Sequence, residues 1–237
     1  MNYAVILAGG KGVRFQGNIP KQFVELTNVP MIVYSMKTAQ LCPYVDVICV
    51  SAPLSYHSQI KNWAEQYNIT KLKFLAEAGQ ERYQSVYNGL LSIPAKSNDS
   101  VIIMTAVCPF VSQTTMSKLY CALNSFDACI TVVKATDAIT FSNDGKSVNR
   151  TLQKKKMFVQ QGPQIYRYGI LKQAHDAYLA DDNRIEVNED SELVLNIGIE
   201  CGMVMGDRFC VKVTYPEDLA IVSALYPLFI KQEQEIN

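Results

Sequence analysis

A short apolar run that leads directly into a cluster of glycines is the feature that most constrains the fold of this chain. Residues 3–7 read YAVIL, and AGGKG follows at 8–12. An apolar run of this length bounded by glycines is typical of a strand buried on both faces. Glycines let the backbone of the following turn approach a ligand closely and point its N–H groups at phosphate oxygens. The pattern predicts an α/β fold with a phosphate-binding loop after the first strand.

The rest of the chain repeats this alternation of apolar runs with segments of helical character. Short apolar runs recur at 45–51, 71–75, 100–105, 128–133 and 202–205. Helical segments fit at 29–41, 55–67, 80–92, 114–126, 168–182 and 216–228. Such alternation predicts a Rossmann-like, mostly parallel sheet covered by helices. With 237 residues and 49% hydrophobic content, we expect one domain that spans residues 1–237.

One polar stretch interrupts the alternation. Residues 135–160 carry a turn signal at Asn143, Asp144 and Gly145, between two flanks that are compatible with strands. We therefore expect a protruding β-hairpin arm. Because an isolated hairpin buries little of its own surface, the arm is expected to pack on a partner subunit. The chain is accordingly predicted to form a homodimer through residues 135–160.

The charge balance and the cysteines argue against several other classes of protein. Lys plus Arg equals Asp plus Glu at 22 each, so no global positive field exists to attract nucleic acid or an anionic membrane. The seven cysteines include no CxxC pair, which favours reduced thiols in a cytoplasmic protein. The N-terminus lacks the basic region of a signal peptide, and no segment approaches the ~20 apolar residues of a membrane span. We expect a cytoplasmic protein with neither a nucleic-acid nor a membrane partner.

The glycine cluster is followed by basic residues at two distances, Arg14 and Lys21. A guanidinium fork and an ammonium point charge together suit a triphosphate. Three alternatives compete with this interpretation. A dinucleotide-binding loop requires GxGxxG, but Phe15 occupies the position of the third glycine, and the GxxxxGK[ST] of a Walker loop is absent. A purely structural turn would leave the cluster of basic and polar residues at 14–22 unexplained.

Several motifs along the chain resemble one family of enzymes. LAGGKGVRF at 7–15 followed by PKQF at 20–23 is similar to the signature of the cytidylyltransferases that act on methylerythritol phosphate and ribitol phosphate. Further segments match the family in order and spacing: AGQERYQSVYNGL at 78–90, VKATDAI at 133–139, QGPQIY at 161–166, NEDSELV at 188–194 and VKVTYPEDL at 211–219. The match covers nearly the whole chain and implies the fold of the nucleotide-diphospho-sugar transferases.

The resemblance also implies a reaction and roles for individual residues. The phosphate oxygen of a polyol phosphate would attack the α-phosphorus of CTP and release pyrophosphate, a step that depends on positioning and charge stabilisation. Arg14, Lys21 and Lys212 correspond to catalytic positions that neutralise charge on the phosphates. The nucleotide would contact Ala8, Gly9, Gly10 and Gly12 at the triphosphate, Gly79, Arg82 and Ser85 at the base and ribose, and Ala106. The acceptor would contact Asp137 and Lys154, in a pocket reached by the arm of a partner subunit.

The chain departs from the family at the metal-binding segment. That segment usually begins with an aspartate and ends in arginine and proline, whereas this chain reads TAVCP at 105–109. Magnesium is expected from the resemblance, but Thr105 stands where its carboxylate ligand would be, and Cys108 stands at the arginine. A second acidic position of the family is occupied by Phe209 or Cys210, and the nearby Asp207 is a candidate substitute ligand.

The acceptor positions are altered as well. Ala138 follows Asp137 where the family has a threonine, and Lys154 replaces the arginine of the arm, which keeps the charge but loses the bidentate fork. LAGG and ATDAI resemble the ribitol-phosphate type more than the methylerythritol type. We therefore expect a CDP-polyol for cell-surface polysaccharide biosynthesis, with 2-C-methyl-D-erythritol 4-phosphate cytidylyltransferase activity as the alternative. The other account is a nucleotide-binding relative that has lost catalysis and serves regulation or partner binding.

Overall fold

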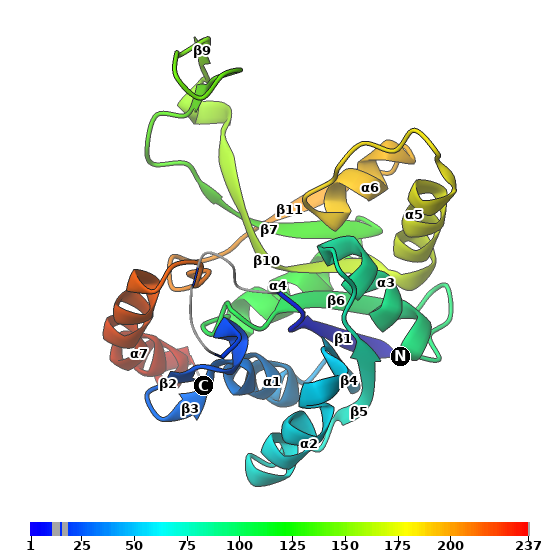
Figure 1. Cartoon of the computed structure of the whole chain (residues 1–237), viewed down its shortest axis with the longest axis vertical. Helices are drawn as coiled ribbons and strands as arrows, with labels where there is room; N and C mark the ends of the chain where they lie inside the picture. The colour runs from blue at the N-terminus through cyan, green and yellow to red at the C-terminus, as the bar shows by residue number, and fades with distance from the viewer. Residues whose placement is uncertain (11–14, 16–18, 237) are drawn as a thin grey trace.

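A sheet of seven strands forms the centre of the molecule (Figure 1). The computed structural model describes residues 1–10, 15 and 19–236. The strand order is β11-β7-β10-β6-β1-β4-β5, and neighbouring strands are parallel except where β10 is one of the pair. The strands are β1 (Asn2–Leu7), β4 (Val47–Ala52), β5 (Leu72–Glu77), β6 (Ser100–Thr105), β7 (Ala128–Lys134), β10 (Phe158–Arg167) and β11 (Cys201–Met205). The prediction of a Rossmann-like, mostly parallel sheet is confirmed.

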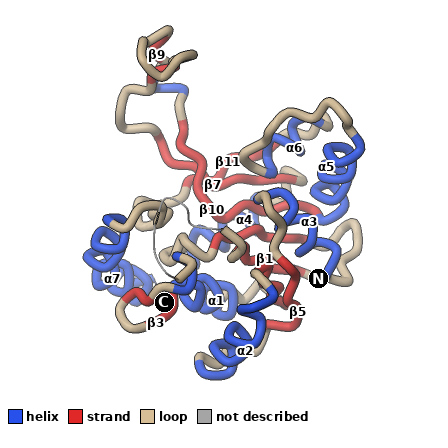
Figure 2. Tube along the Cα trace, in the orientation of Figure 1, coloured by secondary structure: helices blue, strands red, loops and turns tan. Residues whose placement is uncertain are grey.

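Helices cover both faces of this sheet (Figure 2). Alternate side chains of β1 point to opposite faces, as the period of a strand requires. Ala4 and Ile6 belong to an apolar cluster with α1, α2 and α4, whereas Val5 belongs to a second cluster with α3, α5 and α6. The helices are α1 (Met31–Leu41), α2 (His57–Gln66), α3 (Arg82–Ser92), α4 (Gln113–Ala122), α5 (Tyr168–Ala180), α6 (Asp190–Asn196) and α7 (Glu217–Ile236), with short 3-10 turns η1 (Lys21–Phe23), η2 (Leu54–Tyr56) and η3 (Lys154–Lys156).

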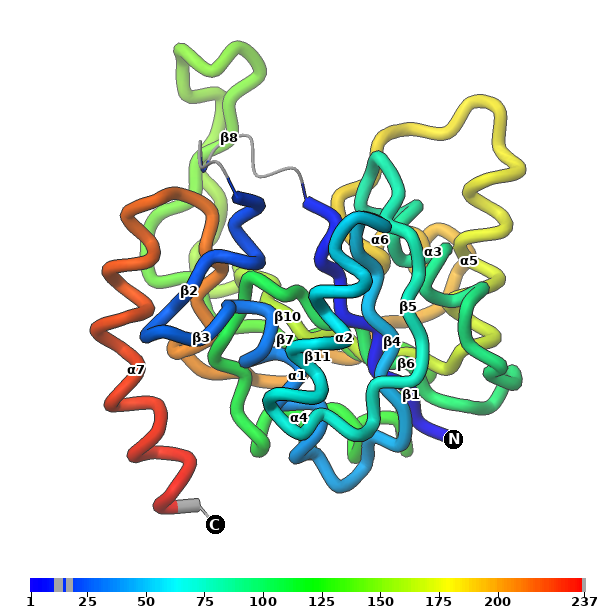
Figure 3. Tube along the Cα trace, turned by 60° about the horizontal axis from the view of Figure 1, so that its bottom comes forward, coloured from blue at the N-terminus to red at the C-terminus, as the bar shows by residue number. Residues whose placement is uncertain are grey.

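A third apolar cluster joins the C-terminal helix to the early part of the chain. Val222 and Phe229 of α7 pack with Met31 and Phe110, and the rings of Phe110 and Phe229 stack with centroids 4.9 Å apart. Figure 3 shows α7 running beside a small two-stranded sheet. That sheet consists of β2 (Glu25–Leu26) and β3 (Val29–Pro30). The packing of α7 therefore holds the preceding segment, which includes residue 212, against the body of the molecule.

The place of β1 in the sheet determines where a ligand site can form. β1 lies between β4 and β6, and the chain adds β4 and β5 on one side before it returns to β6 on the other. Open α/β sheets bind ligands in the crevice at the carboxyl ends of their strands, where the strand order reverses in this way. The glycine cluster directly follows Leu7, and Thr105 ends β6. Both predicted segments therefore lie at this edge.

The polar stretch forms a hairpin that projects from the sheet (Figure 1). It leaves the sheet after β7 and returns at the start of β10, with β8 (Thr140–Phe141) antiparallel to β9 (Arg150–Thr151). Gly145 adopts a φ of 66° in the turn, a conformation that glycine favours. Asp144 accepts hydrogen bonds from the backbone N–H groups of Lys146 and Ser147. The hairpin arm is confirmed, and its role in dimerisation stays a prediction.

One strand of the sheet, β10, and one of the helices that cover it, α6, were not expected from the sequence. The apolar pattern of β10 is broken by Gly162 and Pro163, which indicate a turn rather than a strand. The structure accommodates them by a register shift between Gln161 and Gln164 against β7. α6 has only seven residues, too few for a helical period to be recognised.

Two further expectations concern the thiols and the membrane. All seven cysteines have free thiols, as predicted. Within the described ranges, no helix combines the length and the apolar character needed to cross a bilayer.

Candidate active site

A cavity of about 430 Å³ opens at the carboxyl ends of β1, β5 and β6. Its lining comes from segments that are far apart in the sequence: the glycine cluster, the start of α3, the end of β6 and the segment before α7. The lining residues are Leu7, Ala8, Gly9, Gly10, Lys21, Gln22, Gly79, Gln80, Glu81, Arg82, Ser85, Thr105, Val107, Lys212 and Thr214. The structure thus brings most of the predicted nucleotide-binding residues to one site. Gly12 and Arg14 lie outside the described residues.

The described part of the glycine cluster is fixed by hydrogen bonds that its carbonyl oxygens accept. Gln22, which is 1% exposed, donates from Nε2 to the carbonyl oxygens of Ala8 at 2.6 Å and of Gly10 at 3.1 Å. The N–H of Ala8 donates to the carbonyl oxygen of Ser51 at 2.7 Å and continues the ladder between β1 and β4. The N–H groups of Gly9 and Gly10 form no hydrogen bond within the described part of the chain. These two amides, rather than that of Ala8, can bind a phosphate oxygen.

Two lysines bring positive charge to the cavity from opposite ends of the chain. Lys21 lies in η1 and donates from Nζ to the carbonyl oxygen of Val213 at 2.9 Å. The N–H of Val213 in turn donates to the carbonyl oxygen of Val107 at 2.9 Å, so this segment is fixed next to β6. The exposed Lys212 forms neither an ion pair nor a side-chain hydrogen bond with the residues that the structure describes. Its ammonium is available to an anion.

The loop between β5 and α3 is fixed by short-range hydrogen bonds. Gly79 donates from its N–H to Oγ of the buried Ser85 at 3.0 Å, and that hydroxyl donates to the carbonyl oxygen of Glu81 at 3.3 Å. The side chains of Glu81 and Gln84 form a capping box at the start of α3. A Cβ on Gly79 would lie 2.2 Å from that of Gln84, so only glycine fits. The loop is a rigid wall suited to a flat base.

Arg82 is held between two carboxylates from the start of α6. Its Nη1 lies 2.6 Å from Oδ2 of Asp190, and its Nη2 lies 3.0 Å from Oε2 of Glu189. Oδ1 of Asp190 lies 3.0 Å from Nε2 of His175, and both side chains are fully buried. Burial opposes charge on both groups of the pair, but their interaction outweighs it: the pKa of Arg82 is raised, and that of Asp190 is lowered.

Thr105 lines the cavity, whereas the neighbouring Ala106 does not. Ala106 is fully buried, and its N–H donates to the carbonyl oxygen of Leu7 at 3.0 Å. Val107 lines the cavity in its place. The backbone of Ala106 therefore connects β1 and β6, and its contact with a nucleotide stays a prediction.

The described lining of the cavity offers few ligands for a magnesium ion, since its one carboxylate, that of Glu81, accepts a capping-box hydrogen bond at the start of α3. Among the described residues, no three His, Cys, Asp or Glu side chains gather around a common point, and the segments 11–14 and 16–18 contain no acidic residue. The suggested substitute, Asp207, accepts hydrogen bonds from Oγ of Ser112 at 2.8 Å and from the N–H of Phe209 at 3.0 Å. Mg²⁺ usually requires one or two protein carboxylates besides phosphate oxygens. Thr105 supplies only a hydroxyl.

Cys108, at the position of the family's arginine, contacts another unexpected thiol. A hydrogen bond from Cys210 lowers the pKa of Cys108 and outweighs its burial, with the positive charges of Lys212 and Lys21 acting in the same direction. The pKa of Cys210 is raised by the same contact. Sγ of Cys210 also lies 3.1 Å from the carbonyl oxygen of Gly162, a second acceptor that competes for its single S–H proton. Two departures from the family thus meet beside the cavity.

The predicted acceptor residues lie at the base of the arm. Asp137 lines a separate cavity of about 460 Å³ together with Lys134 and Arg208. Lys154 lies in η3 and donates from Nζ to the carbonyl oxygen of Thr136 at 3.2 Å. Asp137 and Lys154 are thus adjacent, but neither lines the nucleotide cavity of the same subunit.

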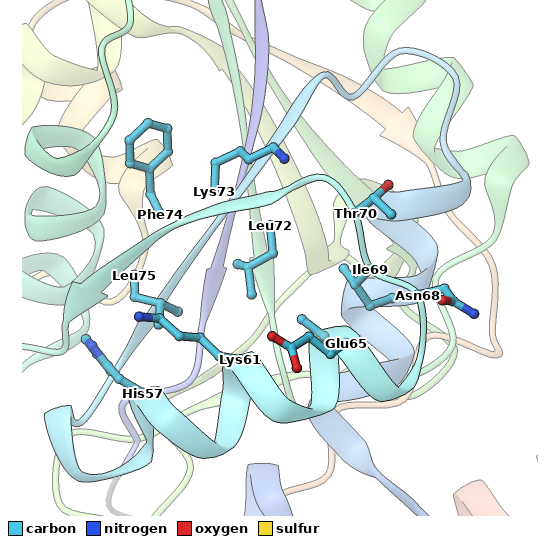
Figure 4. Close-up of a pocket in the computed structure, with 11 residues that line it drawn as sticks. His57, Lys61, Glu65, Asn68, Ile69, Thr70, Leu72, Lys73, Phe74 and Leu75 are labelled. Atoms are coloured by element: carbon cyan, nitrogen blue, oxygen red, sulfur yellow. The ribbon is translucent and has the colours of Figure 1, made fainter.

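A larger cavity of about 600 Å³ lies elsewhere, between α2 and the edge strand β5 (Figure 4). Figure 4 shows His57, Lys61 and Glu65 along α2, with Lys73 on the strand β5 across from them. None of the residues predicted from sequence to bind a ligand lines this cavity. The smaller cavity is the better candidate because phosphate-binding groups converge there.

Sequence reasoning missed three residues that shape the site. His175 lies outside the motifs of the sequence analysis and is buried against Asp190. Asp190 lay within a recognised motif without an assigned role, and Gln22 lay within PKQF. Asp190 and Gln22 share the signal of a polar side chain inside a family motif, whereas His175 lies outside these motifs and gives no such signal.

Comparisons with known proteins agree over nearly the whole chain. Residues 2–226 match the family model of IspD, 2-C-methyl-D-erythritol 4-phosphate cytidylyltransferase. The 2-C-methyl-D-erythritol 4-phosphate cytidylyltransferase of Syntrophus aciditrophicus is 30% identical over 232 residues, which are 98% of this chain and 96% of that protein. The enzyme of the same name from Geobacillus thermodenitrificans is 32% identical over 231 residues, 95% and 97% of the two chains.

Solved structures share the fold. The 4-diphosphocytidyl-2C-methyl-D-erythritol synthase of Anaerococcus prevotii superposes with a TM-score of 0.82 at 23% identity and covers 95% of this chain and 98% of its own. The 2-C-methyl-D-erythritol 4-phosphate cytidylyltransferase of Francisella tularensis gives a TM-score of 0.80 at 26% identity, with 94% and 98% covered.

Proposed function

The chain belongs to the IspD family of cytidylyltransferases, and from that membership we propose that it transfers CMP from CTP to 2-C-methyl-D-erythritol 4-phosphate. A phosphate oxygen of the acceptor forms a new bond to the α-phosphorus of CTP. The bond from that phosphorus to the bridging oxygen of the β-phosphate breaks, and pyrophosphate leaves. The observation that carries this proposal is the convergence of Lys21, Lys212 and the amides of Gly9 and Gly10 on one cavity.

The chemistry asks for positioning and charge stabilisation rather than covalent catalysis. The amides of Gly9 and Gly10 would hold phosphate oxygens, and the ammonium groups of Lys21 and Lys212 would stabilise the charge that develops on the α-phosphate and the departing pyrophosphate. The loop at 79–81 and Ser85 would hold the cytosine. Gly12 and Arg14 belong to this proposal by sequence alone.

The proposed acceptor replaces the one expected from sequence. Ribitol 5-phosphate was preferred because of the LAGG and ATDAI segments, but the relatives described above are named for methylerythritol phosphate. A role in cell-surface polysaccharide biosynthesis has no support from them. Loss of catalysis has no support either, since the lysines that would stabilise the leaving group line the cavity.

The acceptor pocket is proposed to form between two subunits. Asp137 and Lys154 lie at the base of the arm and away from the nucleotide cavity of their own subunit. In a homodimer, residues 135–160 of one subunit would bring these side chains to the cavity of the other.

Pyrophosphate release tests the proposal directly. Purified protein is incubated with CTP and, in parallel, with 2-C-methyl-D-erythritol 4-phosphate, ribitol 5-phosphate or no acceptor. We expect release with the first acceptor only, and much less when ATP or UTP replaces CTP. Faster release with ribitol 5-phosphate would overturn the acceptor assignment. CTP binding by calorimetry without turnover on either acceptor would overturn the enzymatic proposal.

A further inference from the structure

A buried pair lies behind Arg82, on the side away from the nucleotide cavity. Asp190 and His175 are both fully buried and neither lines the cavity, whereas the side chain of Arg82 remains 27% exposed and lines it. We propose that Asp190 and His175 are positioning residues that fix Arg82 and, through it, the wall that receives the base of the nucleotide. This inference rests on the proposed function.

The charges explain why Asp190 depends on both partners. A buried carboxylate is strongly destabilising unless it is paired and hydrogen-bonded. Asp190 uses Oδ2 for Arg82 at 2.6 Å and Oδ1 for His175 at 3.0 Å. Because a carboxylate only accepts, His175 must carry its proton on Nε2 and donate from there. Its other ring nitrogen, Nδ1, has no hydrogen-bond partner among the described residues, so the ring is held from one side only.

Glu189 forms a second ion pair with the guanidinium of Arg82 and is itself fixed by a residue of β10. Its Oε2 lies 3.0 Å from Nη2 of Arg82 and accepts a hydrogen bond of 2.6 Å from Nε2 of Gln164. Gln164 is itself 3% exposed and accepts a hydrogen bond from Tyr166. The guanidinium therefore has one fixed orientation, which planar, bidentate pairing requires.

The position of Arg82 affects the loop at residues 79–81 because Arg82 directly follows this loop in the sequence. It is the first residue of α3 and directly follows Glu81, whose carbonyl oxygen accepts a hydrogen bond from Ser85. Ser85 also accepts from the N–H of Gly79. A shift of the first turn of α3 would therefore move the loop and misalign a bound base. Displacements of about 1 Å are sufficient to weaken a positioned contact.

The test compares steady-state constants of Asp190→Asn and His175→Gln with those of the wild type. Asp190→Asn keeps the shape of the side chain but loses the charge that pairs with Arg82, whereas His175→Gln replaces the planar ring that contacts Asp190 with a flexible amide. We expect KM for CTP to rise about tenfold. We expect kcat and the KM for the acceptor to change by less than about twofold, because the lysines and glycine amides are untouched.

Tyr87→Phe is the matched control. Tyr87 donates from its hydroxyl to Oδ1 of Asp176 at 2.9 Å and stacks its ring on His175. The substitution removes another connection between α3 and α5 and leaves the Arg82 network intact. We expect an unchanged KM for CTP. An equal rise in this control would overturn the proposal, because any loosening of α3 would then have the same effect.

Wild-type protein is measured first, by calorimetry with CTP and by turnover. Failure of the wild type to bind CTP would overturn the proposed function. Normal wild-type turnover with an unchanged KM for CTP in Asp190→Asn would overturn only the positioning role. If Asp190→Asn does not fold, His175→Gln carries the test alone, because it changes only the partner of Oδ1 of Asp190. We expect the same rise in KM for CTP, and an unchanged value would equally overturn the inference.

Discussion

The ammonium of Lys21 donates a hydrogen bond of 2.9 Å to the carbonyl oxygen of Val213. This contact joins the segment after the glycine cluster to the segment that carries Lys212. It holds the positive charges of Lys21 and Lys212 at one cavity, whose lining also includes the carboxylate of Glu81.

Replacing Lys21 with Met should abolish most of the activity. The side chain keeps its length but loses the charge that stabilises the leaving pyrophosphate. We expect kcat to fall by about 10²–10³-fold in the pyrophosphate-release assay. Lys118→Met, on the exposed side of α4, is the control and should retain wild-type turnover. A fall of similar size in both would show a general effect of lost positive charge.

The two described glycines should differ in their tolerance of a methyl group. A Cβ on Gly9 would lie 2.3 Å from that of Ala78 and 3.2 Å from Oγ of Ser85, whereas a Cβ on Gly10 meets no described atom within 4 Å. We expect Gly9→Ala to lower the free energy of unfolding by about 1–3 kcal/mol, and Gly10→Ala to leave it nearly unchanged. Urea denaturation measures both. Equal effects would contradict the close approach of Gly9 to the base loop.

Introducing a carboxylate at Thr105 should create a magnesium ligand at the end of β6. Thr105 lines the cavity at the end of β6, so an aspartate there would face the phosphates. We expect Thr105→Asp to strengthen CTP binding in the presence of Mg²⁺ and to weaken it in EDTA, measured by calorimetry. Thr105→Asn, which has the same shape without charge, should show neither change. An aspartate variant that is insensitive to Mg²⁺ would contradict this assignment.

The stability of the protein should depend on Asp190 in acid. Its pKa is lower in the folded protein than in the unfolded chain, because Arg82 and His175 outweigh its burial. The stabilisation is therefore present above the unfolded value of about 3.9 and is lost as the pH falls through the folded value. Denaturant unfolding should show a larger loss of stability below about pH 4 for the wild type than for Asp190→Asn. Parallel curves in this range would contradict the prediction.

Removing the arm should separate the subunits of a dimer. The arm carries exposed apolar side chains at Phe141 and Val148, which are 43% and 66% exposed in a single chain. Deletion of residues 140–150 should give a monomer by light scattering and should impair acceptor binding more than CTP binding. A dimeric mass after the deletion would place the interface elsewhere.

The success of the sequence prediction depended on the distance between contacting residues. The cavity around Gly9, Lys21 and Ser85 was predictable because each residue belongs to a short motif whose chemistry is local. The network around Arg82 was not, because its partner Asp190 is 108 residues away and side-chain pairing leaves no periodic pattern. The strand β10 was missed for a similar reason, since its central place in the sheet overrides the turn signal of its Gly-Pro pair.

The cavity combines residues from both ends of the chain, so it is completed only late in translation. Its lining includes Gly9 and Lys21, which the ribosome makes early, and Lys212 and Thr214, which it makes some two hundred residues later. A nascent chain can build β1 and its neighbours while it is still being translated, but it cannot bind a nucleotide across the completed cavity. Ligand-assisted folding is therefore available only after residue 214 has left the exit tunnel.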